Sequence, residues 1–356
     1  MPRLQSLDAF RGLTIALMIL VNTPGDGRHV YAPLRHAEWH GWTITDCIFP
    51  SFVWIVGVAI TLSLGRKLDQ PRPAIYKVIL RRAAILFGLG LLIYAFPTFP
   101  LDTFRILGVL QRIAICYAVT AVIFLNTSIR GHILATLALL GGYWAIMTFI
   151  PSPGFAAGDL TVEGNFSHYI DRIVLGAHNY SETRTWDPEG IVSTLPSIAS
   201  CLLGVLAGHI VKASASIERR TQRLLIAGVI LIAAGLVLHP LLPINKKLWT
   251  SSFTLLMAGL DFAIFGALLW IIDGKRIVKP FRPAIIMGMN AIALYLASEF
   301  IEISLQFLHW KKPIYETVFL PLASPINASL LYAVTYTGLH LVLAYSLYRR
   351  NLFFRA

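Results

Sequence analysis

The sequence has few charged residues. Of its 356 residues, 13% are charged and 56% are hydrophobic, and the mean hydropathy is +0.68. Soluble globular domains carry about 25% charged residues, so this composition excludes an ordinary soluble domain and indicates a protein that crosses a membrane several times. The net charge of +12 does not indicate nucleic acid as a partner, because the charge of loops in a membrane protein reports topology.

Cysteine and several catalytic motifs are also missing or scarce. The three cysteines lie in apolar runs without CxxC spacing, which excludes a disulfide framework and a thiolate metal site. The chain contains no GxGxxG, GxxxxGK[ST], HExxH or GxSxG motif. A glycine-rich nucleotide site, a zinc protease and a serine hydrolase elbow therefore have no support.

Long apolar runs are what the sequence has instead. About 20 apolar residues cross the hydrocarbon core as a helix, and we place ten such spans. They cover residues 6–23, 44–65, 76–97, 105–126, 131–150, 190–211, 221–240, 249–272, 283–307 and 327–348. We predict an all-α, polytopic membrane protein with about ten transmembrane helices, forming a single domain over residues 1–356.

The loops between these runs alternate in basic content. The segments "GRKLDQPRPAIYK", "KASASIERRTQR", "DGKRIVKPFRP" and "YRRNLFFRA" are rich in Lys and Arg. Because basic loops stay in the cytoplasm, we expect both termini there and the loops 24–43 and 151–189 outside. The absence of a targeting segment favours a bacterial inner membrane, with the outer loops facing the periplasm.

Polar residues interrupt the apolar runs. Each costs about 2.5–3.5 kcal/mol on insertion scales if charged, so such residues usually have a function or face the protein interior. We expect Asp8 and Arg11 to form a local ion pair, and Arg112 to hold a phosphate or neutralise a buried acid. The set consists of Asp8, Arg11, Asn22, Asp46, Gln111, Arg112, Asp261, Asn290, Glu299 and Glu302, with Glu189 at the mouth of a span.

The stretch "LRHAEWHGWTITDCIFPSF" places two histidines before a span that still carries Asp46. A histidine beside a carboxylate at a membrane surface suits general-base chemistry on a polar acceptor. A metal site made of His29, His36 and His40 is disfavoured, because a loop flanked by Pro and Gly does not fix their spacing, and we predict no metal. Trp39 suits either the membrane interface or the face of a sugar.

Eight blocks, in this order, resemble the transmembrane acetyltransferase family of heparan-α-glucosaminide N-acetyltransferase. They are "SLDAFRGL", "LVN", "RHAEWHGWTITDCIFPSFVWIVG", "RILGVLQRIAICY", "YIDRIVLG", "WDPEGIVSTLPSI", "INKKLWTSSF" and "GMNAIALY". The resemblance covers nearly the whole chain. It implies a multi-span enzyme that takes acetyl from cytoplasmic acetyl-CoA and places it on the amine of a glucosamine-type sugar, as in heparan sulfate, across the membrane. A homodimer is expected by the same analogy.

The resemblance also implies roles for individual residues. His36 is the catalytic residue, as a general base or as a transient acetyl carrier, with Asp46 orienting it and Asn22 donating to the oxyanion or fixing the acceptor. The expected substrate-binding residues are Glu189, Asp187, Trp39, Lys246, Trp249 and Asn290. The expected cofactor-binding residues, for acetyl-CoA, are Arg112, Gln111 and Arg11.

Two other functions remain open from the residues alone. An O-acyltransferase acting on an envelope polysaccharide would use the same histidine and donor. A sugar- or ion-coupled secondary transporter would show two matching halves with broken helices at the midplane, and no such repeat is visible in the sequence.

Overall fold

The computed structural model describes residues 3–354, and this part of the chain is helical without a β-strand. Its α-helices are α1 (Gln5–Asn22), α2 (Ile44–Ser63), α3 (Arg72–Ala95), α4 (Val109–Asn126), α5 (Ile129–Phe149), α6 (Phe166–Leu175), α7 (Thr194–Lys212), α8 (Ile217–Leu238), α9 (Ser251–Leu268), α10 (Arg282–Met289), α11 (Ala291–Phe307), α12 (Lys311–Ile314) and α13 (Pro325–Arg349). The all-α prediction is confirmed. The sequence did not predict the short helices α6 and α12.

Eight helices among the described residues are long and apolar enough to cross a membrane, and a bent pair brings the number to nine. The eight begin with α2, α3, α4, α5, α7 and α8, and end with α9 and α13. Helix α1 covers the first predicted span but is not among them. A multi-span membrane protein follows from these helices, while the exact number of ten spans stays a prediction.

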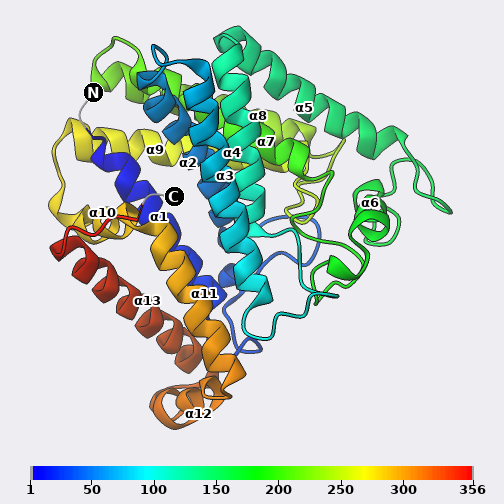
Figure 1. Cartoon of the computed structure of the whole chain (residues 1–356), viewed down its shortest axis with the longest axis vertical. Helices are drawn as coiled ribbons and strands as arrows, with labels where there is room; N and C mark the ends of the chain where they lie inside the picture. The colour runs from blue at the N-terminus through cyan, green and yellow to red at the C-terminus, as the bar shows by residue number, and fades with distance from the viewer. Residues whose placement is uncertain (1–2, 355–356) are drawn as a thin grey trace. The chain divides into compact units, whose positions relative to one another are not determined.

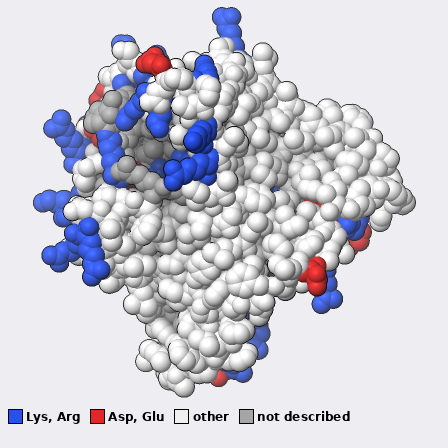
Figure 2. Space-filling model, in the orientation of Figure 1, with Lys and Arg blue, Asp and Glu red and all other residues white. Residues whose placement is uncertain are grey.

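Apolar side chains cover the outer faces of α3, α5, α8 and α13. Leu80, Leu134, Ile226 and Leu339 are each more than 60% exposed, and each stands on a helix of which less than a third is buried. Figure 2 shows wide areas of the visible face without charge, and Lys and Arg gathered in a few clusters. Such faces are satisfied by lipid rather than by water.

The chain divides into two compact units. Unit 1 comprises Met1–Ala37, Trp42–Phe49 and Ile264–Ala356, and unit 2 comprises Glu38–Gly41 and Pro50–Ala263. In unit 1, α1 packs against α10, α11 and α13 (Figure 1). In unit 2, α7 packs against α4, α5 and α8, and α3 packs against α4.

Glycines set the closest helix crossings in each unit. A Cβ on Gly12 would lie 1.7 Å from the Ala284 carbonyl oxygen, where α1 crosses α10. A Cβ on Gly204 would lie 2.0 Å from the Trp54 carbonyl oxygen, where α7 crosses α2. Small residues let helix backbones approach, which is how helices associate inside membranes.

The predicted span 283–307 is not one straight helix. The segments Lys279–Met289 and Ala291–Phe307 meet at an angle of 71°, with Asn290 between them. The Asn290 side chain donates to the Leu352 carbonyl at 3.0 Å and accepts from the Phe354 N–H at 3.0 Å. The prediction of one continuous helix over residues 283–307 is therefore wrong. At the break, the side chain of Asn290 bonds to the C-terminal segment instead of lying within a regular helix.

Candidate active site

Asp46 closes the loop that carries His36. It lies in the first turn of α2 and is 1% exposed. Its Oδ1 is 2.6 Å from His36 Nδ1, and its Oδ2 accepts the backbone N–H groups of Ala37 and Thr43, each at 3.0 Å. The Thr43 hydroxyl lies 3.2 Å from the same oxygen and 2.6 Å from the Arg35 carbonyl. The carboxylate therefore fixes both ends of the loop and the ring of His36.

This contact decides where the histidine carries its proton. A carboxylate accepts, so the neutral imidazole of His36 donates from Nδ1 and carries its lone pair on Nε2. The side chain of His36 is 49% exposed, whereas that of Asp46 is 1% exposed. A buried carboxylate behind an accessible imidazole is the arrangement that orients a general base and stabilises its cation.

Asn22, the third predicted catalytic residue, lies in the same unit. It is the last residue of α1, and its side chain lies near the carboxylate of Glu299 on α11. His36, Asp46 and Asn22 thus all belong to unit 1.

A second group of charges is buried in unit 2. Arg105 donates from Nε and Nη2 to the two carboxylate oxygens of Asp187, at 2.7 and 2.5 Å, and from Nη2 to Glu189. Its guanidinium also lies over the rings of Tyr94, at 5.0 Å, and Tyr180, at 4.5 Å. Burial opposes the ionisation of Glu189, but the positive charges around it, above all Arg105, hold its pKa below the usual value.

Asp171 on α6 folds the "DPEG" turn. Its carboxylate accepts the N–H of Ile191 at 2.9 Å and that of Asp187 at 3.3 Å. A Cβ on Gly190 would lie 2.1 Å from Asp171 Oδ2, so a larger residue at position 190 would displace this carboxylate. Burial, helped by the charge of Asp187, raises the pKa of Asp171 to about 6, although the two N–H donors oppose that shift.

Arg112 and Gln111 are buried on α4, with 1% and 0% exposure. Arg112 Nη2 donates to the Gly190 carbonyl at 2.9 Å and to Ser193 Oγ at 2.5 Å, and its guanidinium lies 5.1 Å from the ring of Trp249. Within residues 3–354, Arg112 Nε and Nη1 and both amide atoms of Gln111 have no hydrogen-bond partner. Unpaired buried polar atoms are costly, so these four atoms suit a polar ligand.

Comparison with known proteins gives the family. Residues 3–236 match the model of the family described as heparan-alpha-glucosaminide N-acetyltransferase, catalytic. The chain belongs to this family. The heparan-alpha-glucosaminide N-acetyltransferases of Homo sapiens and Mus musculus are each 30% identical to it, over alignments that cover 99% of the chain. The chain spans 60% of the length of these two relatives.

Two of the residues predicted to bind the acceptor, Trp39 and Lys246, have contacts within the protein. Trp39 contacts other residues of unit 2. Its Nε1 donates to the Leu160 carbonyl at 2.9 Å. Its ring forms T-shaped pairs with the rings of His168 and Trp186, at centroid distances of 5.6 and 6.1 Å. Lys246 lies near enough to Glu189 to favour its ionised form. A sugar-binding role for either residue stays a prediction.

Trp249, Arg11 and Asn290 take structural positions. Trp249 donates from Nε1 to Ser200 Oγ at 3.1 Å and is 1% exposed. Arg11 Nη1 lies 3.5 Å from Asp8 Oδ1, which confirms the predicted local ion pair. The same nitrogen donates to the Gly288 carbonyl at 3.4 Å. The side-chain amide of Asn290 is hydrogen-bonded to the backbone of Leu352 and Phe354. The ligand-binding roles predicted for Trp249, Arg11 and Asn290 stay predictions.

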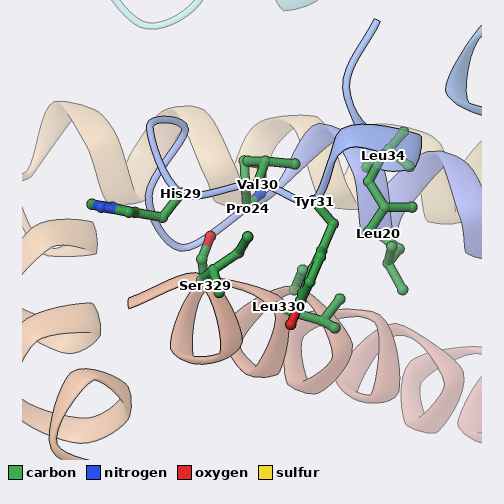
Figure 3. Close-up of a pocket in the computed structure, with 11 residues that line it drawn as sticks. Leu20, Pro24, His29, Val30, Tyr31, Leu34, Ser329 and Leu330 are labelled. Atoms are coloured by element: carbon green, nitrogen blue, oxygen red, sulfur yellow. The ribbon is translucent and has the colours of Figure 1, made fainter. Parts of the chain in front are cut away.

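A small pocket of about 270 Å³, including the solvent at its mouth, lies between the loop after α1 and the start of α13 (Figure 3). Its wall is mostly apolar, as at Leu330. Its polar groups are used within the chain, since Tyr31 donates to Asn327 at 2.5 Å and Ser329 Oγ donates to the Asp26 carbonyl at 3.1 Å. The pocket therefore offers little to a polar sugar.

No three His, Cys, Asp or Glu residues between residues 3 and 354 are arranged to hold a metal ion. Two residues that organise the site were missed by the sequence analysis. Arg105 opens the block "RILGVLQR" and Asp171 stands in "YIDRIVLG", so both lay inside segments that had been recognised. Arg105 stands at the start of the predicted span 105–126, where its charge was the available signal, whereas Asp171 lies within the loop 151–189.

Proposed function

We propose that this chain is a transmembrane acetyltransferase that moves acetyl from acetyl-CoA to the amine of a glucosamine-type sugar, with His36 as the general base. The family supports acetyl transfer, and the observation that carries the role of His36 is its Nδ1 at 2.6 Å from the buried Asp46. Arg112, Gln111 and Arg11 are the residues proposed for the CoA moiety, and Asp187, Glu189, Trp39, Lys246, Trp249 and Asn290 for the side of the acceptor.

The proton balance of the reaction suits this pair. The neutral amine attacks the thioester carbonyl, so a C–N bond forms and the C–S bond breaks. His36 Nε2 takes one proton from the attacking nitrogen and returns it to the leaving thiolate, giving the amide and free CoA thiol. Asp46 stabilises the imidazolium between these two steps. Asn22 is proposed to donate to the oxyanion, where loss of one donor costs about 10²–10³ in rate.

The same pair also suits a covalent route, in which His36 carries the acetyl group before passing it on. In either route the acceptor amine lies outside the cytoplasm, by the distribution of basic loops, and acetyl-CoA is supplied from the cytoplasm. A bacterial inner membrane with its acceptor site facing the periplasm is the proposed setting.

The test uses purified protein in detergent, acetyl-labelled acetyl-CoA and glucosamine. We expect label in the sugar with wild type, and a loss of about 10²–10⁴ with His36→Ala, the range for removing a general base. His29→Ala is the matched control, because His29 is another histidine of unit 1 beside an aspartate, with its Nδ1 3.1 Å from Asp26.

Each other outcome has a meaning. An equal loss of acetyl transfer in His36→Ala and His29→Ala would show that His36 is not the general base. Transfer to a hydroxyl acceptor and not to the amine would make the protein an O-acyltransferase. No transfer from wild type to any sugar would refute the proposal and favour a transporter.

A further inference from the structure

Two contacts to the main chain hold the short segment that carries His40. The Gly41 N–H donates to the Ile244 carbonyl at 2.7 Å, and Lys247 Nζ donates to the Glu38 carbonyl at 2.6 Å. All of these residues belong to unit 2. The position of His40 is therefore fixed from both sides.

Asn245 decides which nitrogen of His40 carries the proton. Its side chain is fully buried; Oδ1 accepts the Leu248 N–H at 2.9 Å, and Nδ2 lies 3.4 Å from His40 Nδ1. A backbone N–H only donates, so its contact with Asn245 fixes which end of the amide is the oxygen. Nδ2 then donates to His40 Nδ1, and the neutral imidazole carries its hydrogen on Nε2.

His40 presents this N–H to solvent. It is exposed, whereas Asn245 is fully buried, so the Nε2 edge of the ring points away from the protein. Burial of part of the ring, helped by the charge of His239, lowers the pKa of His40, which keeps the imidazole neutral near pH ~7. His36 is the opposite case, because its neutral ring donates from Nδ1 to Asp46 and carries its lone pair on Nε2. One exposed histidine thus offers a base and the other a fixed donor.

We infer that His40 binds the acceptor by donating from Nε2–H to a hydroxyl oxygen of the amino sugar. The inference rests on the proposed function, which supplies the sugar. The ring of His40 lies 6.0 Å from that of Trp39, a residue proposed for the acceptor side. An aromatic ring beside a few fixed polar groups is the usual composition of a small-molecule site.

This contact forms and breaks no covalent bond, so its loss should weaken binding of the sugar and leave the chemical step unchanged. We expect His40→Ala to raise KM for glucosamine about fivefold, as for loss of one neutral hydrogen bond, with kcat and KM for acetyl-CoA unchanged. His40→Gln keeps an N–H donor of similar reach and should recover part of the loss. An effect of His40→Ala on kcat alone, or no effect on KM for the sugar, would overturn the inference.

His178→Ala is the matched control. His178 is another imidazole of unit 2 in a loop, but its Nδ1 lies 2.9 Å from the Phe104 carbonyl, so its neutral ring carries the lone pair on Nε2. Its removal should change neither KM. An equal rise of KM for the sugar in both variants would show that His40 has no specific contact with it.

A set of glucosamine analogues that each lack one hydroxyl group locates the contact on the sugar. With wild type, the analogue without the hydroxyl that His40 binds should have a KM about fivefold above that of glucosamine. For this analogue alone, His40→Ala should cause no further rise, because both changes remove the same contact. A full effect of His40→Ala on every analogue would overturn the inference.

Asn245→Asp tests the direction of the hydrogen bond. The carboxylate still accepts the Leu248 N–H, but it also accepts from His40 Nδ1 and so moves the proton away from Nε2. At about pH 9, where the imidazole is neutral, this variant should raise KM for the sugar as His40→Ala does, and the double variant should add nothing. Thermal unfolding in detergent checks that each variant is folded. A folded Asn245→Asp protein with the wild-type KM would overturn the inference.

Calorimetric binding of glucosamine without acetyl-CoA separates this inference from the proposed function. Sugar bound by wild type and more weakly by His40→Ala, with no acetyl transfer, would refute the acetyltransferase and keep the binding role of His40. Active wild type with the same KM and affinity as His40→Ala would refute the binding role alone. Neither transfer nor binding by wild type would refute both.

Discussion

Asp46 and Asp171 are two buried aspartates that do the same local task in different units. Each accepts two backbone N–H groups and so closes a loop: Asp46 those of Ala37 and Thr43, and Asp171 those of Asp187 and Ile191. The difference lies in the third partner. Asp46 also holds an imidazole that is half-exposed, whereas Asp171 faces the turn that carries a buried ion pair.

The comparison separates a reactive carboxylate from a scaffolding one. Loop closure by a carboxylate is a structural device that either unit can use, and it says nothing about catalysis. What gives Asp46 a role in chemistry is that it sets the tautomer of an accessible histidine. Changes around Asp46 should therefore lower the rate of acetyl transfer, whereas changes around Asp171 should lower or alter the stability of the fold.

The largest effect is expected for Asp46→Asn. The amide can still accept one backbone N–H, but it no longer selects the Nδ1–H tautomer of His36 or stabilises its cation. In a serine protease triad the same change lowers kcat about 10⁴-fold, and we expect a loss of 10³ or more here, on the order of that precedent. Acetyl transfer and thermal unfolding, measured together, check this. If the free energy of unfolding falls by as much as the activation free energy of transfer rises, Asp46 acts on the structure of its loop, as Asp171 does, rather than on the chemistry.

Arg105→Met should act mainly on stability. It leaves the carboxylates of Asp187 and Glu189 buried without their cation, and breaking a buried pair in this way costs about 3–5 kcal/mol. Unfolding in detergent measures it. The control is Arg28→Met, which removes an exposed pair with Asp26 at 2.9 Å and should change little. A stable Arg105→Met protein would contradict the scaffolding role of this cluster.

Asp171→Asn should change how stability depends on pH. The pKa of Asp171 in the folded protein, about 6, lies above the ordinary value, so the folded state binds more protons than the unfolded one between pH ~4 and ~6. This group therefore makes the wild type less stable as pH rises through that window, by up to about 1.4 kcal/mol per pH unit.

The measurement is the difference in unfolding free energy between wild type and Asp171→Asn across this pH range. Asp102→Asn, a change at an exposed aspartate, serves as the control. A difference that stays constant from pH 4 to 6 would show that Asp171 does not titrate there.

Thr43→Val should give the smallest effect. It removes the hydroxyl that lies between Arg35 and Asp46 but keeps the backbone N–H that Asp46 accepts. Loss of one neutral hydrogen bond is worth about 1 kcal/mol, so kcat should fall about fivefold. A larger loss than with Asp46→Asn would mean that the loop, rather than the imidazole, limits the reaction.

Much of the fold followed from the sequence, because apolar runs of sufficient length specify helices by themselves. Each predicted span contains a helix, and both His36 and Asp46 were recognised from one short stretch. The break at Asn290 was missed, since its cause is a contact with Leu352 and Phe354, more than sixty residues away. Arg105 was missed because its partners Asp187 and Glu189 lie beyond three intervening α-helices, α4, α5 and α6.

The sequence by itself determined a helical membrane protein of this acetyltransferase family and the pairing of a histidine with a nearby aspartate. These features depend on residues close together in the chain, where periodicity and composition carry the information. Only the tertiary structure decided which carboxylate serves the imidazole and which serves the "DPEG" turn. Those partners are set by helix packing, which brings distant residues together and buries charges that must then find their counterparts.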